Sequence, residues 1–493
     1  MARKAATLAV AELHYCQIAL CNSNCFNNIS IMCLLPLFLF AFSGIGIATS
    51  RTIITSIPGF NGTLPFTLET GYVGVGELDD VQLFYYFVES QRNPEQDPLL
   101  LWLTGGPGCS TLSAFFYESG PVIFNTDGYK GGLPTLSLND YAWTQRLNII
   151  YLDAPVGSGF SYSTSQQGYY IDDYKSSAQT YQFLRKWLID HPQFLENNLY
   201  IGGDSYSGIP VPMLVQEIIS GNGAEKEPFM NLQGYVLGNP VTDSYIDDNS
   251  RIPFAHRLTL ISDDLYQSAK TSCNGDYVNV VNEQCESAIE AIDELVRDIN
   301  LVQVLDPYCG EASARPHELS WRRRSLKEHS KSSLLWQPND SAYYCHDYVY
   351  VLCAVWANDK GVRKALHVRE GTKGVWERCN GSLAYTKDVT SSVAYHQNLT
   401  SAALRALIYS GDHDMSVPHI GTQEWIGSLN LTVGSVWRAW FVDGQVAGYV
   451  KKLTENNFAL TYATVKGAGH VAPEYKPKEC YTMLDRWFAY YPL

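Results

Sequence analysis

The order of apolar and polar positions along the chain predicts strands that alternate with helices. Short apolar runs recur as candidate strands: Leu99–Leu103, Ile149–Leu152, Leu199–Gly202, Tyr235–Leu237, Leu407–Tyr409 and Phe458–Val465. Helical spacing is clearest over Ser176–Ile189 and Pro210–Ile219. Buried runs of this length, alternating with helices, favour an α/β fold with a mostly parallel central sheet. The β-like run Tyr72–Val88 predicts antiparallel strands at the start.

The pattern changes between Asp243 and Val368. Strand-like runs become rare there, and helical spacing dominates over Asp263–Lys270 and Glu286–Ile299. We therefore expect residues 243–368 to form a helical insertion that caps the sheet. It would divide an α/β core into a first part, 51–242, and a second part, 369–493, after an N-terminal extension at 1–50.

Residues 312–338 within this insertion are basic and rich in serine. They hold six Lys or Arg residues against two Glu, and few apolar residues recur at helical or strand spacing. Such a segment predicts an exposed loop. Two interpretations stay open: a linker that is excised by proteolysis, and an ordinary solvated loop.

Composition narrows the function classes. The chain has 493 residues, of which 46% are apolar, so a sizeable core can form. It has 35 basic and 50 acidic residues, a net charge of −15. Nucleic-acid binding depends on a cationic surface that releases counterions, so this balance argues against a nucleic-acid partner. Enzymes, binding modules and cell-surface domains remain open.

The N-terminal region predicts entry into the secretory pathway. Leu34–Ala48 carries no charge and ends in small residues, as a secretory signal does. The alternative is a signal anchor that stays in the membrane, although the run is short for a bilayer span. We expect cleavage, and no stable membrane span afterwards. Five glycosylation sequons support a lumenal location: Asn61, Asn339, Asn380, Asn398 and Asn430.

Eight cysteines follow the predicted signal: Cys109, Cys273, Cys285, Cys309, Cys345, Cys353, Cys379 and Cys480. None forms the paired C-x-x-C pattern of a zinc site, so no metal is expected. In an oxidising compartment most of them should be bridged. Their spacing does not determine the pairing, although Cys273 and Cys285 would close a short local loop.

The strongest chemical signal is the segment Leu199–Gly208, LYIGGDSYSG. A strand ends there, small residues permit a sharp turn, and a helix begins. This arrangement exposes a serine hydroxyl beside helix amides and makes Ser205 a candidate nucleophile. The general pattern is G-x-S-x-G, whereas this chain has Ser207 at the last position and Gly208 one residue later. Taken alone, the segment is equally compatible with a structural turn.

A serine nucleophile needs a base and a group that orients the base. His470 lies in a glycine-rich segment after a strand, VKGAGHVAP, and Asp414 lies in a loop after another strand, IYSGDHDMSVP. The chain order Ser, Asp, His is that of α/β-hydrolases. Asp412, closer to its strand, is expected to cap the loop instead. His413 and His419 are expected to be solvated loop residues or minor pocket walls.

Acyl chemistry also needs hydrogen-bond donors where the oxyanion forms. The segment Leu101–Cys109, LWLTGGPGC, is a strand followed by a glycine turn. The amides of Gly106 and of Tyr206, the residue after the nucleophile, are the expected donors. No GxxxxGK[ST] pattern is present, so this turn does not indicate a phosphate loop, and no cofactor is expected.

Together these motifs resemble the serine carboxypeptidase-like proteins, especially those of plants. The matching runs are LLLWLTGGPGCS (99–110), NIIYLDAPVGSGFSYS (148–163), YIGGDSYSG (200–208), IYSGDHDMSVP (408–418) and GAGHVAPEYKPKEC (467–480). The resemblance implies an α/β-hydrolase fold with a helical insertion over the active site, the triad Ser205, Asp414 and His470, and an oxyanion hole from Gly106 and Tyr206. It also implies three disulfides, with two cysteines left free: Cys109–Cys379, Cys273–Cys285 and Cys309–Cys345, with free Cys353 and Cys480. The last bridge would hold two chains together if the basic loop were excised.

The same family contains peptidases and acyltransferases. By the resemblance, peptidases carry Asn in W-L-N-G-G-P-G and Glu in G-E-S-Y, and these side chains hold the C-terminal carboxylate of a peptide. Here Thr104, which precedes Gly105, and Asp204 stand at those positions. This pair resembles the acyltransferase branch, in which a 1-O-β-glucose ester donates its acyl group to an alcohol or amine acceptor. A protein of this branch would act in an acidic compartment of the secretory pathway, namely the vacuole or the apoplast. The alternatives are a serine carboxypeptidase and a binding or chaperone-like protein without turnover.

Overall fold

The computed structural model describes residues 50–127, 129–308, 346 and 349–493. The predicted signal segment, the basic segment 312–338, Cys309, Cys345 and Asn339 lie outside these residues. The predictions that concern them are therefore not addressed by the structure.

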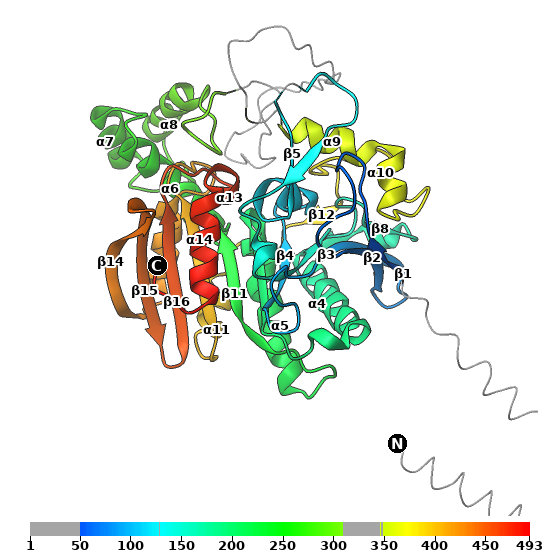
Figure 1. Ribbon diagram of the computed structural model, residues 1–493. Coiled ribbons are helices and arrows are strands. Elements are labelled where there is room, and N and C mark those ends of the chain that lie inside the picture. Colours follow the sequence, from blue (N-terminus) through cyan, green and yellow to red (C-terminus); the bar gives the residue numbers. More distant parts are fainter. Residues whose placement is uncertain (1–49, 128, 309–345, 347–348) are drawn as a thin grey trace, which may run out of the picture. The chain divides into compact units, whose positions relative to one another are not determined.

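A mixed β-sheet forms the centre of the described chain (Figure 1). Within the described residues it has twelve strands, in the order β1-β2-β3-β7-β4-β10-β11-β13-β16-β15-β14, with β8 paired to β3. The strands are β1 (Ser50–Ile54), β2 (Leu68–Val75), β3 (Val81–Val88), β4 (Leu99–Leu103), β7 (Asn148–Leu152), β8 (Tyr162–Ser163), β10 (Leu199–Asp204), β11 (Leu232–Gly238), β13 (Arg405–Gly411), β14 (Thr432–Val442), β15 (Gln445–Glu455) and β16 (Phe458–Val465). The central strands, from β7 to β16 in this order, run parallel, and the strands at both ends are antiparallel.

The predicted α/β-hydrolase fold is confirmed, and each expected apolar run lies in a strand of this sheet. The β-like run at the start forms the antiparallel pair β2–β3. The antiparallel hairpin β14–β15 had no counterpart among the expected strands. Its register shifts at three points and much of β14 is exposed, so neither strand shows a continuous apolar run.

Alternation along the strands divides the core between the two faces of the sheet. In β4, Leu100 and Trp102 join one hydrophobic cluster, whereas Leu99, Leu101 and Leu103 join the other. The first cluster packs against α9 (Val349–Asn358), α10 (Lys360–Ala365) and α14 (Pro477–Phe488). The second packs against α4 (Asp173–Asp190), α5 (Pro210–Gly223) and α12 (His419–Ser428). Shorter elements are α11 (Val393–Leu399), α13 (Ala472–Tyr475), the pair β5 (Val122–Phe124) and β6 (Leu136–Leu138), and the pair β9 (Ile171–Asp172) and β12 (Tyr385–Thr386).

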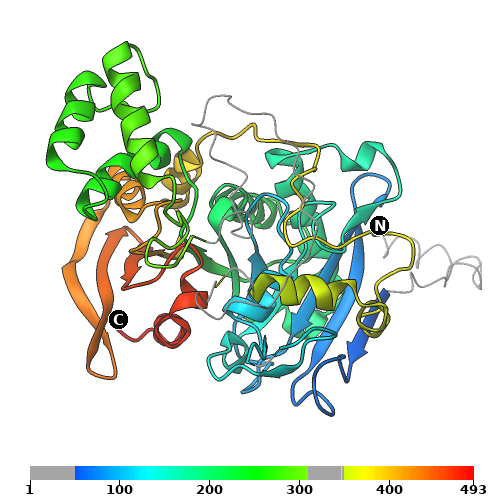
Figure 2. The ribbon, with the colours of Figure 1, turned by 90° about the horizontal axis from the view of Figure 1, so that it is seen from above.

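The residues predicted to form the insertion contribute helices to two separate places. The helices α6 (Ser244–Arg257), α7 (Asp263–Ser272) and α8 (Glu283–Val296) supply most of a small hydrophobic cluster, which also includes Met415. The helices α9 and α10 instead pack into the main core, where Trp356 is buried. Figures 1 and 2 show the green helices α7 and α8 well apart from the yellow helices α9 and α10.

Candidate active site

Ser205 lies on a strained turn between a strand and a helix. The strand β10 ends at Asp204, a 3₁₀ turn spans Ser205–Gly208, and α5 begins at Pro210. Ser205 has φ +57°, in the left-handed region that non-glycine residues seldom adopt. Its two neighbours in the chain are buried, whereas Ser205 itself is partly exposed. The turn therefore presents the hydroxyl at the end of the sheet.

Ser207 fits this turn although the general pattern has glycine at its position. A Cβ atom on Gly203 would lie 2.6 Å from the Cβ of Ser207. The absence of a side chain at Gly203 makes room for the buried Ser207. The departure from the general pattern is thus accommodated locally.

His470 and Asp414 meet Ser205 at the carboxyl ends of parallel strands. The Nε2 atom of His470 lies 2.7 Å from Ser205 Oγ, and its Nδ1 atom lies 2.7 Å from Asp414 Oδ2. Because a carboxylate can only accept, Nδ1–H donates to Asp414 and the serine hydroxyl donates to Nε2. Ser205 follows β10, Asp414 follows β13 and His470 follows β16, so the order of strands in the sheet brings together residues far apart in sequence.

The carboxylate of Asp414 is fully buried and accepts four hydrogen bonds. Its Oδ1 atom accepts from the amides of Ser416 (2.7 Å) and Val417 (3.1 Å). Its Oδ2 atom accepts from His470 and from the side-chain amide of Asn239, at 2.8 Å. Burial disfavours a charged imidazole, but the Asp414 carboxylate outweighs it and raises the pKa of His470 above 6.5.

The neighbouring polar residues of this loop have structural contacts. Asp412 Oδ1 accepts from the amide of Gly467 and lies 2.6 Å from Nδ1 of His413, so it ties the loop after β13 to the loop that carries His470. His419 is the first residue of α12 and is half-buried, and burial lowers its pKa.

The glycine turn after β4 packs directly on the nucleophile turn. A Cβ atom on Gly105 would lie 2.6 Å from both Ser205 Cβ and the amide nitrogen of Tyr206. Only glycine permits this approach. Gly106, with φ +117°, continues the turn, and the disulfide Cys109–Cys379 anchors its far end. The two segments expected to supply oxyanion donors are therefore in contact.

Thr104 and Asp204 both bury polar atoms that have no hydrogen-bond partner among the described residues, namely Thr104 Oγ1 and Asp204 Oδ1. Thr104 lines a small cavity with Gly105 and Tyr206. Burial raises the pKa of Asp204 from 3.8 to about 6, and nearby His470 opposes this rise. Glu118 is also buried and interacts electrostatically with Asp204, and burial holds its pKa well above the ordinary value.

The side chain of Tyr206 is held by a residue that sequence reasoning missed. Its phenol donates to Asp173 Oδ1 at 2.8 Å, and the phenol of Tyr385 donates to the same atom at 2.8 Å. Asp173 Oδ2 accepts from the amides of Asp388 and Val389, both at 2.9 Å. No local motif announces this network, because Asp173 lies in the first turn of α4 and its partners lie on two other segments.

Comparisons with known proteins give the family of this chain. The serine carboxypeptidase family model matches residues 58–490. The chain belongs to the serine carboxypeptidase family. Serine carboxypeptidase-like 17 of Arabidopsis thaliana is 47% identical over 451 residues, which cover 91% of this chain and 95% of that protein. Serine carboxypeptidase-like 3 of the same plant is 46% identical over 462 residues, which cover 93% and 97%.

Among solved structures, this serine carboxypeptidase family member is similar to Kex1Δp, a prohormone-processing carboxypeptidase from Saccharomyces cerevisiae. The TM-score is 0.67 with 19% sequence identity, over 86% of this chain and 91% of that one. At this identity the likeness concerns the fold. It agrees with the α/β-hydrolase architecture described above.

Two disulfides of this family member lie in the described residues. Cys109 pairs with Cys379, and Cys273 pairs with Cys285. These are two of the pairs that the resemblance implied, and Cys353 and Cys480 are free and buried. The sequon residues Asn61, Asn398 and Asn430 are exposed. Asn380 is only partly exposed, and its side-chain nitrogen donates to the carbonyl of Gly157, so it is the least accessible of the four described sequons.

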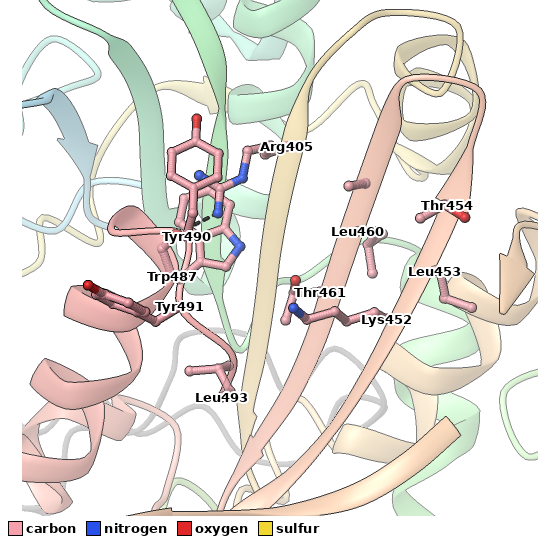
Figure 3. Close-up of a pocket in the computed structure, with 11 residues that line it drawn as sticks. Arg405, Lys452, Leu453, Thr454, Leu460, Thr461, Trp487, Tyr490, Tyr491 and Leu493 are labelled. Carbon is pink, nitrogen blue, oxygen red and sulfur yellow. Dashed lines mark hydrogen bonds between the residues drawn. The ribbon is translucent and has the colours of Figure 1, made fainter. Parts of the chain in front are cut away.

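A second cavity lies at the opposite end of the parallel strands from the triad, and Figure 3 shows the residues that line it. It is lined by Arg405, the first residue of β13, whereas Asp414 follows the end of that strand. Figure 3 shows the guanidinium of Arg405 against the rings of Trp487 and Tyr490. Its central carbon lies 4.2 and 3.8 Å from the two ring centroids. One guanidinium nitrogen also donates to the carbonyl of Trp487. Arg405 thus anchors the end of α14.

The described residues contain neither a metal-binding cluster nor a membrane-crossing helix. In that part of the chain, no group of three or more His, Cys, Asp or Glu side chains is placed to hold a metal ion. None of the helices described has the length and apolar character that crossing a membrane requires.

Proposed function

We propose that this family member is an acyltransferase that takes an acyl group from a 1-O-β-glucose ester and passes it to an alcohol or amine. One observation carries the proposal: Thr104 and Asp204 bury unpartnered oxygen atoms beside the nucleophile turn. Buried polar groups normally have partners, and a bound substrate is one way to supply them. Neutral sugar hydroxyls both donate and accept, so they suit a threonine hydroxyl and a carboxyl in either protonation state.

The same pair is poorly suited to the C-terminal carboxylate of a peptide. Threonine lacks the amide donor of asparagine, and Asp204 is one methylene shorter than glutamate. The pKa of Asp204 is about 6. Above that pH the residue is an anion and repels a carboxylate, whereas below it the protonated form can donate to one, so in acid the argument rests on Thr104 and on the shorter side chain of Asp204. A neutral sugar meets no such repulsion.

In the proposed reaction His470 removes the proton of Ser205 while Oγ attacks the ester carbonyl. The amides of Gly106 and Tyr206 stabilise the oxyanion of the tetrahedral intermediate. The bond to the glucose oxygen then breaks, and His470 returns the proton to that oxygen, which leaves an acyl group on Ser205. The acceptor attacks this acyl-enzyme, with His470 as base again, and Ser205 is regenerated. Asp414 orients the imidazole and stabilises its charged form.

A carboxypeptidase that releases C-terminal amino acids is the second candidate. The name of the family model favours it, since it refers to a carboxypeptidase. In that reaction water replaces the acceptor and a peptide replaces the glucose ester. The triad chemistry is otherwise the same.

The test uses the full chain, purified from a secretory host. It would be incubated with acyl-glucose esters and with blocked dipeptides, each with and without a pool of alcohols and amines, and all products identified by mass spectrometry. Ser205→Ala is the control. A conjugate that needs the acceptor and disappears in the control supports the transferase, and its mass identifies the acceptor. Release of a free C-terminal amino acid would instead make the chain a peptidase.

The cellular setting is part of the proposal. We infer a secreted or vacuolar glycoprotein whose signal is removed, with a two-chain form if residues 312–338 are excised. Peptide mapping of the protein from its native tissue tests both processing steps.

A further inference from the structure

Asn239 lies where β11 ends, between the strands that lead to Ser205 and to Asp414. In the sheet β11 lies between β10 and β13, and Asn239 is the residue that directly follows it. It is completely buried. Its φ of +42° is in the left-handed region, which asparagine tolerates better than most side chains. Asn239 is therefore a fully buried polar residue with an uncommon backbone conformation, and its contacts show why it is suited to the place.

Both polar groups of the Asn239 side chain contact the end of β13 or the loop that follows it and holds Asp414. Its Nδ2 atom donates to Asp414 Oδ2 at 2.8 Å, and its Oδ1 atom accepts from the amide of Gly411 at 3.1 Å. The backbone N–H of Asn239 donates to the backbone carbonyl of Tyr409 at 2.7 Å. Asn239 therefore connects the end of β11 to the end of β13.

We propose that Asn239 is a positioning residue that orients the Asp414 carboxylate toward His470. This inference rests on the proposed Ser205 chemistry and deepens it. The oxygen that accepts from Asn239 is the same one that accepts from His470, so the amide restrains the position of the oxygen that the imidazole contacts. A side chain at this position must donate to a carboxylate and accept from an amide at once, which asparagine does and aspartate does only when protonated.

Other charged and titratable groups near the pair come from every neighbouring element. They are Asp204 at the end of β10, Arg251 and Arg257 on α6, Asp412 and His413 in the loop after β13, and His419 on α12. They are the same in the wild type and in each variant below. A difference in pH dependence between variants therefore reports on position 239.

The experiment measures how fast a fluorophosphonate inactivates the full chain, as a function of pH. This probe reacts with an activated serine and needs no knowledge of the natural substrate. The variants are Asn239→Ala and Asn239→Asp. The matched control is Asn148→Ala, because Asn148 is also fully buried and its side chain bonds Ser90, Pro94 and Asp97, at the start of β7 and away from the triad. The melting temperature of each protein is recorded alongside.

We expect Asn239→Ala to slow inactivation by about 10–100-fold across the pH range. In Asn239→Asp, the new carboxyl can replace the amide while it carries a proton. Once ionised it can no longer donate to Asp414 and repels that carboxylate, which moves it out of line with His470. The ratio of the Asn239→Asp rate to the wild-type rate should therefore fall as pH rises. Asn148→Ala should lower the melting temperature and leave the rate within about twofold of wild type.

A constant ratio of Asn239→Asp to wild type across pH would overturn the proposal, as would an equal loss of rate in Asn239→Ala and Asn148→Ala. If Asn239→Ala does not fold, the near-isosteric Asn239→Asp decides alone. Failure of the proposed acyl transfer is distinguishable, because it would leave these inactivation rates unaffected.

Discussion

Asp173 accepts a hydrogen bond from the phenol of Tyr206, the residue that follows the nucleophile, with 2.8 Å between the two oxygens. Tyr206 thus has two ends with separate tasks: its amide faces the glycine turn at Gly105, and its phenol is fastened to α4. Movement of the phenol would be transmitted to the amide proposed as an oxyanion donor.

Removal of that phenol should therefore slow turnover. We expect Tyr206→Phe to lower kcat by about 10-fold with little change in KM, because a misplaced oxyanion donor weakens binding of the transition state more than that of the substrate. Steady-state kinetics on the substrate found in the product survey measure this. Tyr385→Phe removes a bond to the same oxygen and should cost similar stability with a smaller loss of kcat. Equal kinetic losses in both variants would show that the network is only structural.

Changing Thr104 and Asp204 should alter the substrate preference. The double variant Thr104→Asn with Asp204→Glu restores the pair that the resemblance associates with peptidases, and we expect it to release C-terminal amino acids from blocked dipeptides at acidic pH. Acyl-glucose turnover should fall in the same protein, because the longer acid fills space beside the nucleophile. The two activities are measured in parallel, with Ser205→Ala as blank. A double variant with unchanged preference would place the selectivity elsewhere.

The disulfide Cys109–Cys379 should matter for activity more than Cys273–Cys285 does. It joins residues 270 apart and holds the glycine turn beside Ser205, whereas Cys273–Cys285 joins residues 12 apart next to α7 and α8. Replacement of either pair by serines should lower the free energy of unfolding by roughly 2–5 kcal/mol. Only the Cys109/Cys379 variant should also lose most of its kcat. Calorimetry and kinetics on the two variants, side by side, check this expectation.

The rate should fall at acidic pH because the base becomes protonated. The pKa of His470 lies above 6.5, since the Asp414 carboxylate outweighs the effect of burial. The neutral imidazole that accepts the serine proton is thus lost as pH falls through this pKa. The negative charge of Asp204 contributes to the same rise. Asp204→Asn should therefore move the acid limb of kcat/KM to lower pH. A rate that climbs steadily below pH 4 would contradict this assignment.

Asp247 should make the fold more stable in acid. It is buried on α6, and burial raises its pKa from 3.8 to about 7. A carboxyl whose pKa is raised by folding stabilises the fold fully below the unfolded pKa, and this contribution is lost as pH rises through the folded pKa. Between about pH 4 and pH 7 the loss is on the order of 3–4 kcal/mol. Urea unfolding at several pH values should show a decline in stability that Asp247→Asn, uncharged and of equal size, largely abolishes.

The fold class and the candidate reacting side chains could be predicted because both are encoded locally. A strand buried on both faces must be a continuous apolar run, and a nucleophile turn needs small residues around its serine. Both signals stand within about ten residues, as in Leu199–Gly208. The hairpin β14–β15 escaped prediction for the converse reason, because its pairing and its exposed face interrupt the local pattern.

The sequence by itself therefore determined the α/β core and singled out Ser205, Asp414 and His470 as candidate reacting groups, whose side chains the structure brings within hydrogen-bond distance. Only the tertiary structure decided which residues hold those groups in place. Asn239 and Asp173 act on partners from other strands and loops, and no short motif contains both members of either pair. The pKa of Asp204 likewise depends on burial by distant segments. Local propensity is a property of neighbours in the chain, whereas hydrogen bonding and desolvation are properties of neighbours in space.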